Sequence, residues 1–254
     1  MDLGLRGKRA IVTGSTKGIC RRVVDLLVDE GADVAICARS PEAVAKALKE
    51  LKHNADGRVV GRACNVRKED EYKQWIEDMV QELGGVDIFI PGVSAGGGMD
   101  SERNWWNAFE VDVLSVVRGC ETVIPHMKKA GGGAITIISS TAAVETFMVP
   151  QAYNSMKAAL LTYAKQLGQF VGADGIRVNT VSPGPIEFEG GAWDMIKETM
   201  EGVYKHTVKA HPTGRLGKPE EVANCIVFLS SPAASWVNGS NLVIDGGYTK
   251  RVQF

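Results

Sequence analysis

Short β-branched runs alternate with longer helical patterns along the whole chain, and this alternation limits the fold more than any other feature. Several of the runs are almost continuous in Val, Ile and Ala, as in parallel strands that are covered on both faces. The pattern predicts an α/β fold: a doubly wound parallel sheet of about seven strands with right-handed crossovers and helices on both faces. The predicted strands are 9–13, 33–38, 59–64, 86–90, 134–139, 176–181 and 241–245, and the clearest helices are 18–30, 41–51, 69–83, 102–129, 150–172 and 219–230.

The chain is expected to form a single domain over residues 1–254, because it contains no linker, repeat or low-complexity tract. One segment interrupts the alternation, at about residues 185–215, between the last two predicted strands. It follows the carboxyl end of a strand, which is the edge where open α/β sheets bind ligands. We therefore expect it to be a substrate lid.

The overall charge argues against two classes of partner. A formal net charge of −1 gives no electrostatic reason to bind nucleic acid or an anionic membrane.

The five cysteines have no CxxC spacing and favour a reducing compartment, and the four histidines have no spacing suited to a metal ion. The polar N-terminus runs directly into a strand, so a cytoplasmic protein is expected.

The stretch TGSTKGIC, residues 13–20, lies between a predicted strand and a predicted helix. In such a loop Gly14 allows a tight turn, and Gly18 lets the backbone approach a phosphate at the helix N-terminus. Cys20 stands where a third glycine is usual, on the inner face of the helix. We interpret it as a small buried group that contacts the sheet; the alternative, a redox-sensing thiol, requires exposure and a lowered pKa.

The end of the second strand indicates which dinucleotide is bound. An acidic side chain about twenty residues after the glycine loop would bind the ribose 2′-hydroxyl of NAD(H), but this chain has Arg39 there. A guanidinium suits a 2′-phosphate, and Lys17 in the glycine loop adds a second cation. The prediction is NADP(H) as the preferred cofactor, with NAD(H) as the alternative; the competing interpretation is that both cations are solvated.

The stretch YNSMK places Tyr153 and Lys157 one helical turn apart. An ammonium near a phenol favours the phenolate and lowers its pKa, so the pair can exchange a proton with an alcohol or a developing alkoxide. The helix follows a strand that ends at Ser139 and Ser140, which brings hydroxyl groups to the same sheet edge.

Taken together, TGSTKGIC, Ile138–Ser140, YNSMK, RVNTVSPG and NLVIDGG resemble the short-chain dehydrogenase/reductase family, in a branch like the 3-oxoacyl reductases. The resemblance runs from about residue 5 to residue 250 and implies a Rossmann-type sheet and a homotetramer. It implies that Ser140, thirteen positions before Tyr153, polarises a carbonyl, that Tyr153 is the acid–base residue, and that Lys157 assists it. The cofactor-binding residues predicted in all are Gly14, Thr16, Lys17, Gly18, Ile19, Arg39, Asn65, Val66, Gly92, Val93, Tyr153, Lys157, Pro183, Gly184 and Ile186.

The chain also departs from the family pattern. PGVSAGG, with Gly92 and Val93, replaces a stretch that is often Asn-Asn-Ala-Gly, and Asn65 replaces an adenine-side aspartate. Asp112 stands in place of the asparagine of the proton-relay helix, where a carboxylate can pair with the catalytic lysine or hold a relay water. Phe188 replaces a threonine that contacts the cofactor in the family.

These observations favour an NADP(H)-dependent oxidoreductase that interconverts a secondary alcohol and a ketone. Phe147, Phe188 and Trp193 predict an apolar substrate pocket. The departures from the pattern leave a catalytically weak or inactive nucleotide-binding regulatory protein as the alternative. A nucleotide-sugar epimerase or dehydratase shares YxxxK but usually needs a longer chain, and it ranks last.

Overall fold

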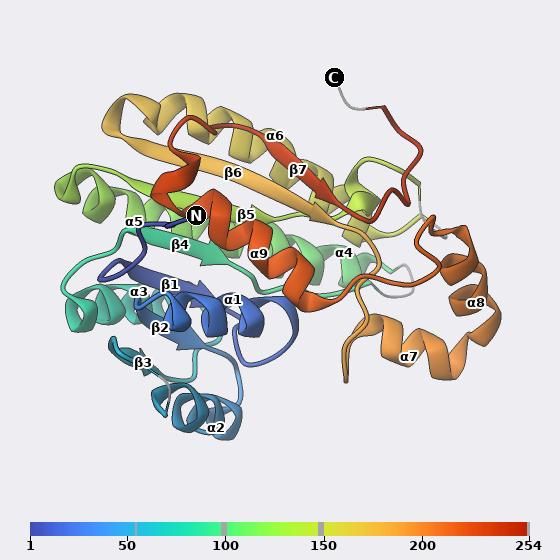
Figure 1. Ribbon diagram of the computed structural model, residues 1–254, viewed down its shortest axis with the longest axis horizontal. Helices are drawn as coiled ribbons and strands as arrows, with labels where there is room; N and C mark the ends of the chain where they lie inside the picture. The colour runs from blue at the N-terminus through green and yellow to red at the C-terminus, as the bar shows by residue number, and fades with distance from the viewer. Residues whose placement is uncertain (54, 98–100, 147–149, 253–254) are drawn as a thin grey trace.

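The computed structural model describes residues 1–53, 55–97, 101–146 and 150–252 and contains one parallel sheet of seven strands in the order β3-β2-β1-β4-β5-β6-β7. The predicted doubly wound α/β fold is confirmed (Figure 1). The strands are β1 (Arg9–Thr13), β2 (Asp33–Cys37), β3 (Val59–Gly61), β4 (Ile88–Pro91), β5 (Gly133–Ile138), β6 (Ile176–Pro183) and β7 (Asn241–Ile244).

Helices cover both faces of this sheet and divide the core into two layers. One layer packs under α1 (Gly18–Asp29), α2 (Pro41–Lys52) and α9 (Pro219–Ser230). The other packs under α3 (Glu69–Leu83), α5 (Ser115–Ala130) and α6 (Ala152–Val171). The central strands are fully buried because apolar side chains meet a helix layer on either side.

The order of the strands determines where a ligand can bind. The chain winds outward from β1 to β2 and β3, then returns to the other side of β1 with β4, so the strand order reverses beside β1. Thr13 pairs with both Cys37 and Pro91, so the carboxyl ends of β1, β2 and β4 are level. A crevice at the carboxyl edge beside such a reversal is the usual dinucleotide site of open α/β sheets.

The helix predicted over 102–129 is interrupted in the structure. It consists of α4 (Glu102–Ala108), a π-helical turn at Phe109–Leu114, and α5, joined end to end. The π turn inserts the equivalent of one extra residue, and such turns often occur at functional sites.

The region predicted to be a lid contains two short helices, α7 (Ala192–Thr199) and α8 (Glu201–Ala210), which lie to one side of the sheet's carboxyl edge (Figure 1). Met200 separates them with φ −137° and ψ 54°, which is not helical. Their apolar side chains, among them Trp193 and Ile196, pack with Leu216 in a small cluster separate from the two main layers. In the part of the chain that the structure describes, no helix is both long and apolar enough to cross a membrane.

Candidate active site

A buried ion pair stands at the centre of the candidate site. The Lys157 ammonium lies 3.0 Å from Oδ1 of Asp112, and both side chains are almost completely buried. Lys157 Nζ also donates a hydrogen bond to the Ile138 carbonyl at the end of β5, at 3.0 Å. Burial by itself lowers the pKa of Lys157, but the charge of Asp112 and the neighbouring Tyr153 raise it, and the net pKa lies above its ordinary value. The lysine is therefore held as a cation.

The π turn brings Asp112 to this position. Asp112 lies within the turn, and its second carboxylate oxygen accepts a hydrogen bond from the Ala95 amide at 3.0 Å. The Ser115 hydroxyl donates to the Val111 carbonyl, which lies in the same turn, at 2.6 Å. Asp112 thus connects the segment after β4 to the lysine on α6. Of the two roles considered for this carboxylate, the structure has the ion pair with Lys157.

Tyr153 lies in the first turn of α6, where it is half-buried, and the Lys157 ammonium is 5.7 Å from the centroid of its ring. The Ser139 hydroxyl donates to the backbone carbonyl of Lys157 at 2.8 Å, so it fixes α6 against β5. The Ser140 hydroxyl accepts a hydrogen bond from the Ala142 amide and keeps its proton free to donate. The structure therefore brings Asp112, Tyr153 and Lys157 together at the edge where Ser140 follows β5.

The glycine loop has the backbone that a phosphate site requires. Gly14 and Gly18 have φ values of +66° and +60°, a left-handed backbone conformation that residues other than glycine rarely adopt. A Cβ at Gly14 would lie 3.1 Å from the Gly92 carbonyl oxygen, so the turn also packs closely against the end of β4. Among the described residues no side chain caps α1, whose first turn contains no acid. Its free N–H groups and positive dipole end fit an anionic group.

Cys20 packs against the glycine that follows β4. Its side chain is 4% exposed, and its Sγ lies 4.0 Å from the Gly92 carbonyl oxygen. A Cβ built at Gly92 would overlap this sulfur atom. Burial raises the pKa of the Cys20 thiol to about 12, against an opposing effect of the Lys157 charge. The predicted buried packing role of Cys20 is confirmed, and the exposed, low-pKa thiol of the redox alternative is not present.

The two cations predicted to recognise a 2′-phosphate have different surroundings. Arg39 is exposed just after β2 and makes no ion pair within the described residues. Lys17 Nζ donates to the Gly190 carbonyl in the lid region at 3.2 Å. On the adenine side, Val66 is buried, and the side-chain oxygen of Asn65 accepts from the Arg67 amide at 3.2 Å. This leaves the Asn65 amide group as the available hydrogen-bond donor.

The remaining predicted cofactor residues surround the same edge. Pro183 ends β6, the Gly184 amide donates to the Ile244 carbonyl at 2.9 Å, and Ile186 forms a bridge with Gly217. Thr16 and Ile19 are half-buried at the glycine loop, and Val93 is half-buried after β4.

Of the residues predicted to form the substrate pocket, the two that the structure describes have different surroundings. Phe188 packs against Gly18: a Cβ there would lie 2.7 Å from the Phe188 ring carbon Cζ. The Trp193 side chain is only 8% exposed and is buried in the small cluster with Ile196 and Leu216. Phe147 lies outside the described residues. Phe188 therefore belongs to the surroundings of the glycine loop in this structure.

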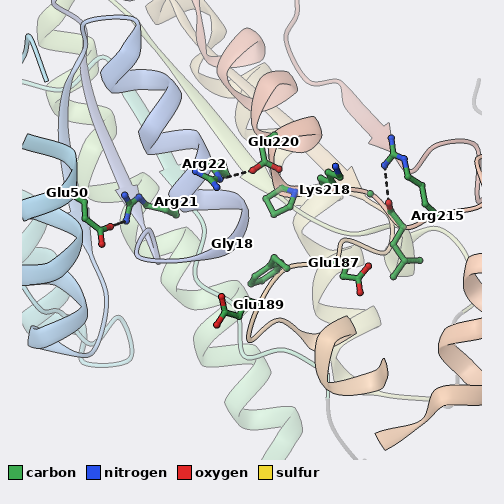
Figure 2. Close-up of a pocket in the computed structure, with 13 residues that line it drawn as sticks. Gly18, Arg21, Arg22, Glu50, Glu187, Glu189, Arg215, Lys218 and Glu220 are labelled. Atoms are coloured by element: carbon green, nitrogen blue, oxygen red, sulfur yellow. Dashed lines mark hydrogen bonds and ion pairs between the residues drawn. The ribbon is translucent and has the colours of Figure 1, made fainter. Parts of the chain in front are cut away.

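A cavity of about 610 Å³ lies beside the glycine loop, between the start of α1, the start of α9 and the segment after β6 (Figure 2). Most of its charged side chains are already paired, for example Arg21 with Glu50 and Arg22 with Glu220 (Figure 2). Gly18 and Phe188 also line it, so Phe188 borders both this cavity and the glycine loop.

Several contacts that shape the site could not be predicted from sequence patterns. The backbone groups of Ile138 and Ala95 hold the ion pair, and the Ser139 hydroxyl holds α6, but backbone partners have no sequence signature. Within the described part of the chain, no group of three or more His, Cys, Asp or Glu side chains is arranged to hold a metal ion.

Comparison with known proteins places this arrangement among enzymes. A family model described as enoyl-(acyl carrier protein) reductase matches residues 14–249. Isoepoxydon dehydrogenase patN from Penicillium expansum is 35% identical over 258 residues, covering 100% of this chain and 99% of that protein. The crystal structure of L-sorbose reductase from Gluconobacter frateurii, complexed with NADPH and L-sorbose, has a TM-score of 0.92 at 31% identity, covering 99% of this chain and 100% of that one. A 7α-hydroxysteroid dehydrogenase complexed with NADH and 7-oxo glycochenodeoxycholic acid has a TM-score of 0.90 at 30% identity, covering 99% and 98%.

Proposed function

Because the chain belongs to the short-chain dehydrogenase/reductase family, we propose that it interconverts a secondary alcohol and a ketone with NADP(H), using Tyr153 as acid and base. The coarser assignment is established: the chain is an oxidoreductase that acts on CH–OH groups with a nicotinamide cofactor. The observation that supports the finer proposal best is the position of Tyr153 in the first turn of α6, with the Lys157 ammonium 5.7 Å from the centroid of its ring.

The residues at the carboxyl edge fit a dinucleotide. The uncapped start of α1 and the close backbone at Gly14 and Gly18 suit its phosphates, and Pro183, Gly184 and Ile186 would line the nicotinamide end. Thr16, Ile19, Asn65, Val66, Gly92 and Val93 would complete the nucleotide site. When bound, the cofactor supplies or accepts the hydride, and the protein supplies orientation and electrostatics.

The proton is handled by the chain's own side chains. In the direction of reduction the Tyr153 hydroxyl donates a proton to the developing alkoxide, and the Ser140 hydroxyl donates a hydrogen bond to the same oxygen. The Lys157 ammonium places a fixed positive charge beside the phenol, and Asp112 keeps that ammonium oriented. In the direction of oxidation Tyr153 accepts the proton.

The preference for NADP(H) is proposed from Arg39. Its exposed guanidinium follows β2, at the position where an acid would select NAD(H). Related structures hold either nucleotide, NADPH in the sorbose reductase and NADH in the hydroxysteroid dehydrogenase, so the choice depends on residues such as Arg39.

The substrate is proposed to be an apolar alcohol or ketone, since the segment beyond the carboxyl edge carries accessible apolar side chains, Met195 at 57% and Met200 at 38% exposed. A homotetramer is also proposed. A second copy of the chain would cover three large apolar side chains: Trp236 and Phe170, which are 98% and 80% exposed, and Leu242 on the outer strand β7.

The five free cysteines are in keeping with a reducing, cytoplasmic location.

The experiment that tests the proposal is Tyr153→Phe, with Tyr163→Phe on the same helix as the matched control. We expect Tyr153→Phe to lower kcat by about 10²–10⁴-fold while NADPH binding persists, and Tyr163→Phe to leave kcat nearly unchanged. Retained turnover in Tyr153→Phe would contradict the mechanism.

A second pair of variants tests the choice of cofactor. Arg39→Ala is expected to weaken NADPH binding by about 10–100-fold and to leave NADH binding nearly unchanged, since a charge-assisted hydrogen bond contributes about 1.5–3 kcal/mol. Arg6→Ala, at the opposite end of β1, is the control. An equal loss for both nucleotides would argue against recognition of a 2′-phosphate.

The regulatory alternative is distinguished by the same assays. Asp112 is the observation that favours it, because a carboxylate that pairs with Lys157 competes with Tyr153 for the positive charge. NADPH binding with no hydride transfer, or only very slow transfer, to any of a broad set of ketones would support the alternative, and turnover of one of them at about 1–10³ s⁻¹ would exclude it.

A further inference from the structure

The turn at residues 188–191, here called the lid turn, lies directly on the glycine loop. The Phe188 ring occupies the position toward which a side chain on Gly18 would point, since a Cβ there would lie 2.7 Å from Cζ and 2.8 Å from Cε2. On the other side of the turn, the Gly190 carbonyl accepts a hydrogen bond from Lys17 Nζ at 3.2 Å. Two residues of the glycine loop thus hold one turn of the lid region.

This position conflicts with the proposed binding of a phosphate. The missing side chain of such a glycine is what allows a phosphate to approach the backbone. The Phe188 ring therefore lies on the side of Gly18 that a phosphate would use, close to the free N–H groups at the start of α1.

We propose that Phe188 and the Lys17–Gly190 hydrogen bond form a latch that closes the phosphate site, so that a dinucleotide binds only after the lid turn has moved away. This inference rests on the nucleotide binding proposed above. It makes Phe188 and Lys17 residues that control cofactor entry, and it differs from the substrate-pocket role predicted for Phe188.

The surroundings of the lid turn allow such a motion. Gly190 has φ +67°, and among the described residues no atom lies within 4 Å of a Cβ built there. Its amide donates to the Asp194 carboxylate at 2.9 Å, so the turn is tied to the start of α7 but is not enclosed at that point. Phe188 lines the cavity of about 610 Å³, which gives its ring space to move into.

The residues before the turn are fixed, which confines the motion. The Glu187 amide donates to the Gly217 carbonyl at 2.9 Å, and the Glu187 carboxylate accepts hydrogen bonds from Lys197 and Tyr204 at 2.9 and 3.0 Å. Movement of the lid turn therefore starts after Glu187, which also connects the turn to α7 and α8.

Lys17 makes the latch sensitive to the type of cofactor. Its ammonium holds the Gly190 carbonyl in this structure, and it is also one of the two cations proposed to meet a 2′-phosphate. A 2′-phosphate would draw Lys17 away from Gly190, because a charge-assisted hydrogen bond to an anion is stronger than one to a neutral carbonyl. Both nucleotides must wait for the latch to open, but NADPH is expected to hold it open more strongly than NADH, because it engages Lys17.

Stopped-flow measurement of energy transfer from tryptophan to bound NADPH or NADH tests the latch without turnover. Phe188→Ala removes the ring without adding a polar group, and Phe170→Ala, at an exposed phenylalanine on α6, is the matched control. We expect Phe188→Ala to raise the association rate constant and to lower the apparent Kd for NADH by about tenfold or more, since the closed fraction no longer reduces the affinity. Phe170→Ala is expected to match the wild type.

Lys17→Met is the second variant, which breaks the hydrogen bond and keeps the ring. It is expected to bind NADH more tightly than the wild type and to lose part of its preference for NADPH. If NADH binding is weaker or unchanged in both variants, the latch is overturned. NADPH binding by the wild type would still uphold the proposed function in that case. If neither nucleotide binds to any of the proteins, both proposals fail. Circular dichroism verifies that each variant is folded.

Discussion

The contact between Cys20 and Gly92 gives a prediction that can be worked out from the structure. Gly92→Ala introduces a Cβ that overlaps the Cys20 sulfur and lies 2.9 Å from the Thr13 carbonyl oxygen. Overpacking of this kind costs about 1–3 kcal/mol of unfolding free energy. Cys20→Ala removes the sulfur and keeps the helix, at a cost of ~1 kcal/mol for the lost burial.

In the double variant the sulfur is absent, but the contact with the Thr13 carbonyl oxygen is unchanged. That contact is common to both backgrounds and cancels in a double-mutant cycle, so the cycle isolates the overlap with the sulfur. We expect Gly92→Ala to be less destabilising in the Cys20→Ala background than in the wild type, by about 1–3 kcal/mol.

The assay is urea unfolding followed by circular dichroism, at one fixed concentration of protomers because association would affect the apparent stability. If the effects of the two substitutions add to within about 0.5 kcal/mol, the reasoning is refuted. The cysteine and the glycine would then be independent departures from the family pattern, and not a matched pair.

Three further predictions concern other parts of the molecule. Asp112→Asn removes the counterion of a buried ammonium and is expected to cost about 3–5 kcal/mol at pH 7. In the wild type the raised pKa of Lys157 gives stability that is fully present below about pH 10.4 and is lost as the pH rises through the folded-state pKa, so the cost of Asp112→Asn should shrink over that range. Urea unfolding at pH 7 and at several pH values above about 10.5 measures this change, and a cost that stays constant throughout would contradict the assignment. Since burial raises the pKa of Cys20 to about 12, iodoacetamide at pH 8 should leave this thiol unmodified in the folded protein while it reacts after unfolding, as peptide mass spectrometry would show. Trp236→Glu should lower the molar mass in light scattering if a second copy of the chain covers this side chain; an unchanged mass places the interface elsewhere.

The sequence predicted the strands and helices well where their pattern depends on burial. The bounds of β1, α3 and α9 agree with the predicted ranges, because their apolar side chains face a core with a regular period. The strand predicted at 59–64 ends at Gly61, since it lies at the edge of the sheet and pairs with β2 alone. The motifs also placed Asp112, Tyr153 and Lys157 correctly relative to one another.

Other features depend on contacts between distant segments and could not be derived from local patterns. FEVDVL has the composition of an ordinary helix, and its π geometry appears only with the hydrogen bonds of the folded chain. The position of Phe188 on Gly18 requires the path of the segment after β6, which no periodicity encodes. The break at Met200 between α7 and α8 likewise has no proline or glycine at that residue to signal it.

The π turn also bears on how the segment Glu102–Ala130 tolerates changes in length. A π turn is an α-helix with one surplus residue, and each residue rotates an α-helix by about 100°. The wider π turn absorbs the rotation that its surplus residue would otherwise impose, so deleting one residue within Phe109–Leu114 would let the segment close into a regular α-helix with α4 and α5 in nearly their present relation. Such a deletion is therefore expected to act on the turn itself, and so on Asp112 and its ion pair with Lys157, while the flanking helices keep their contacts.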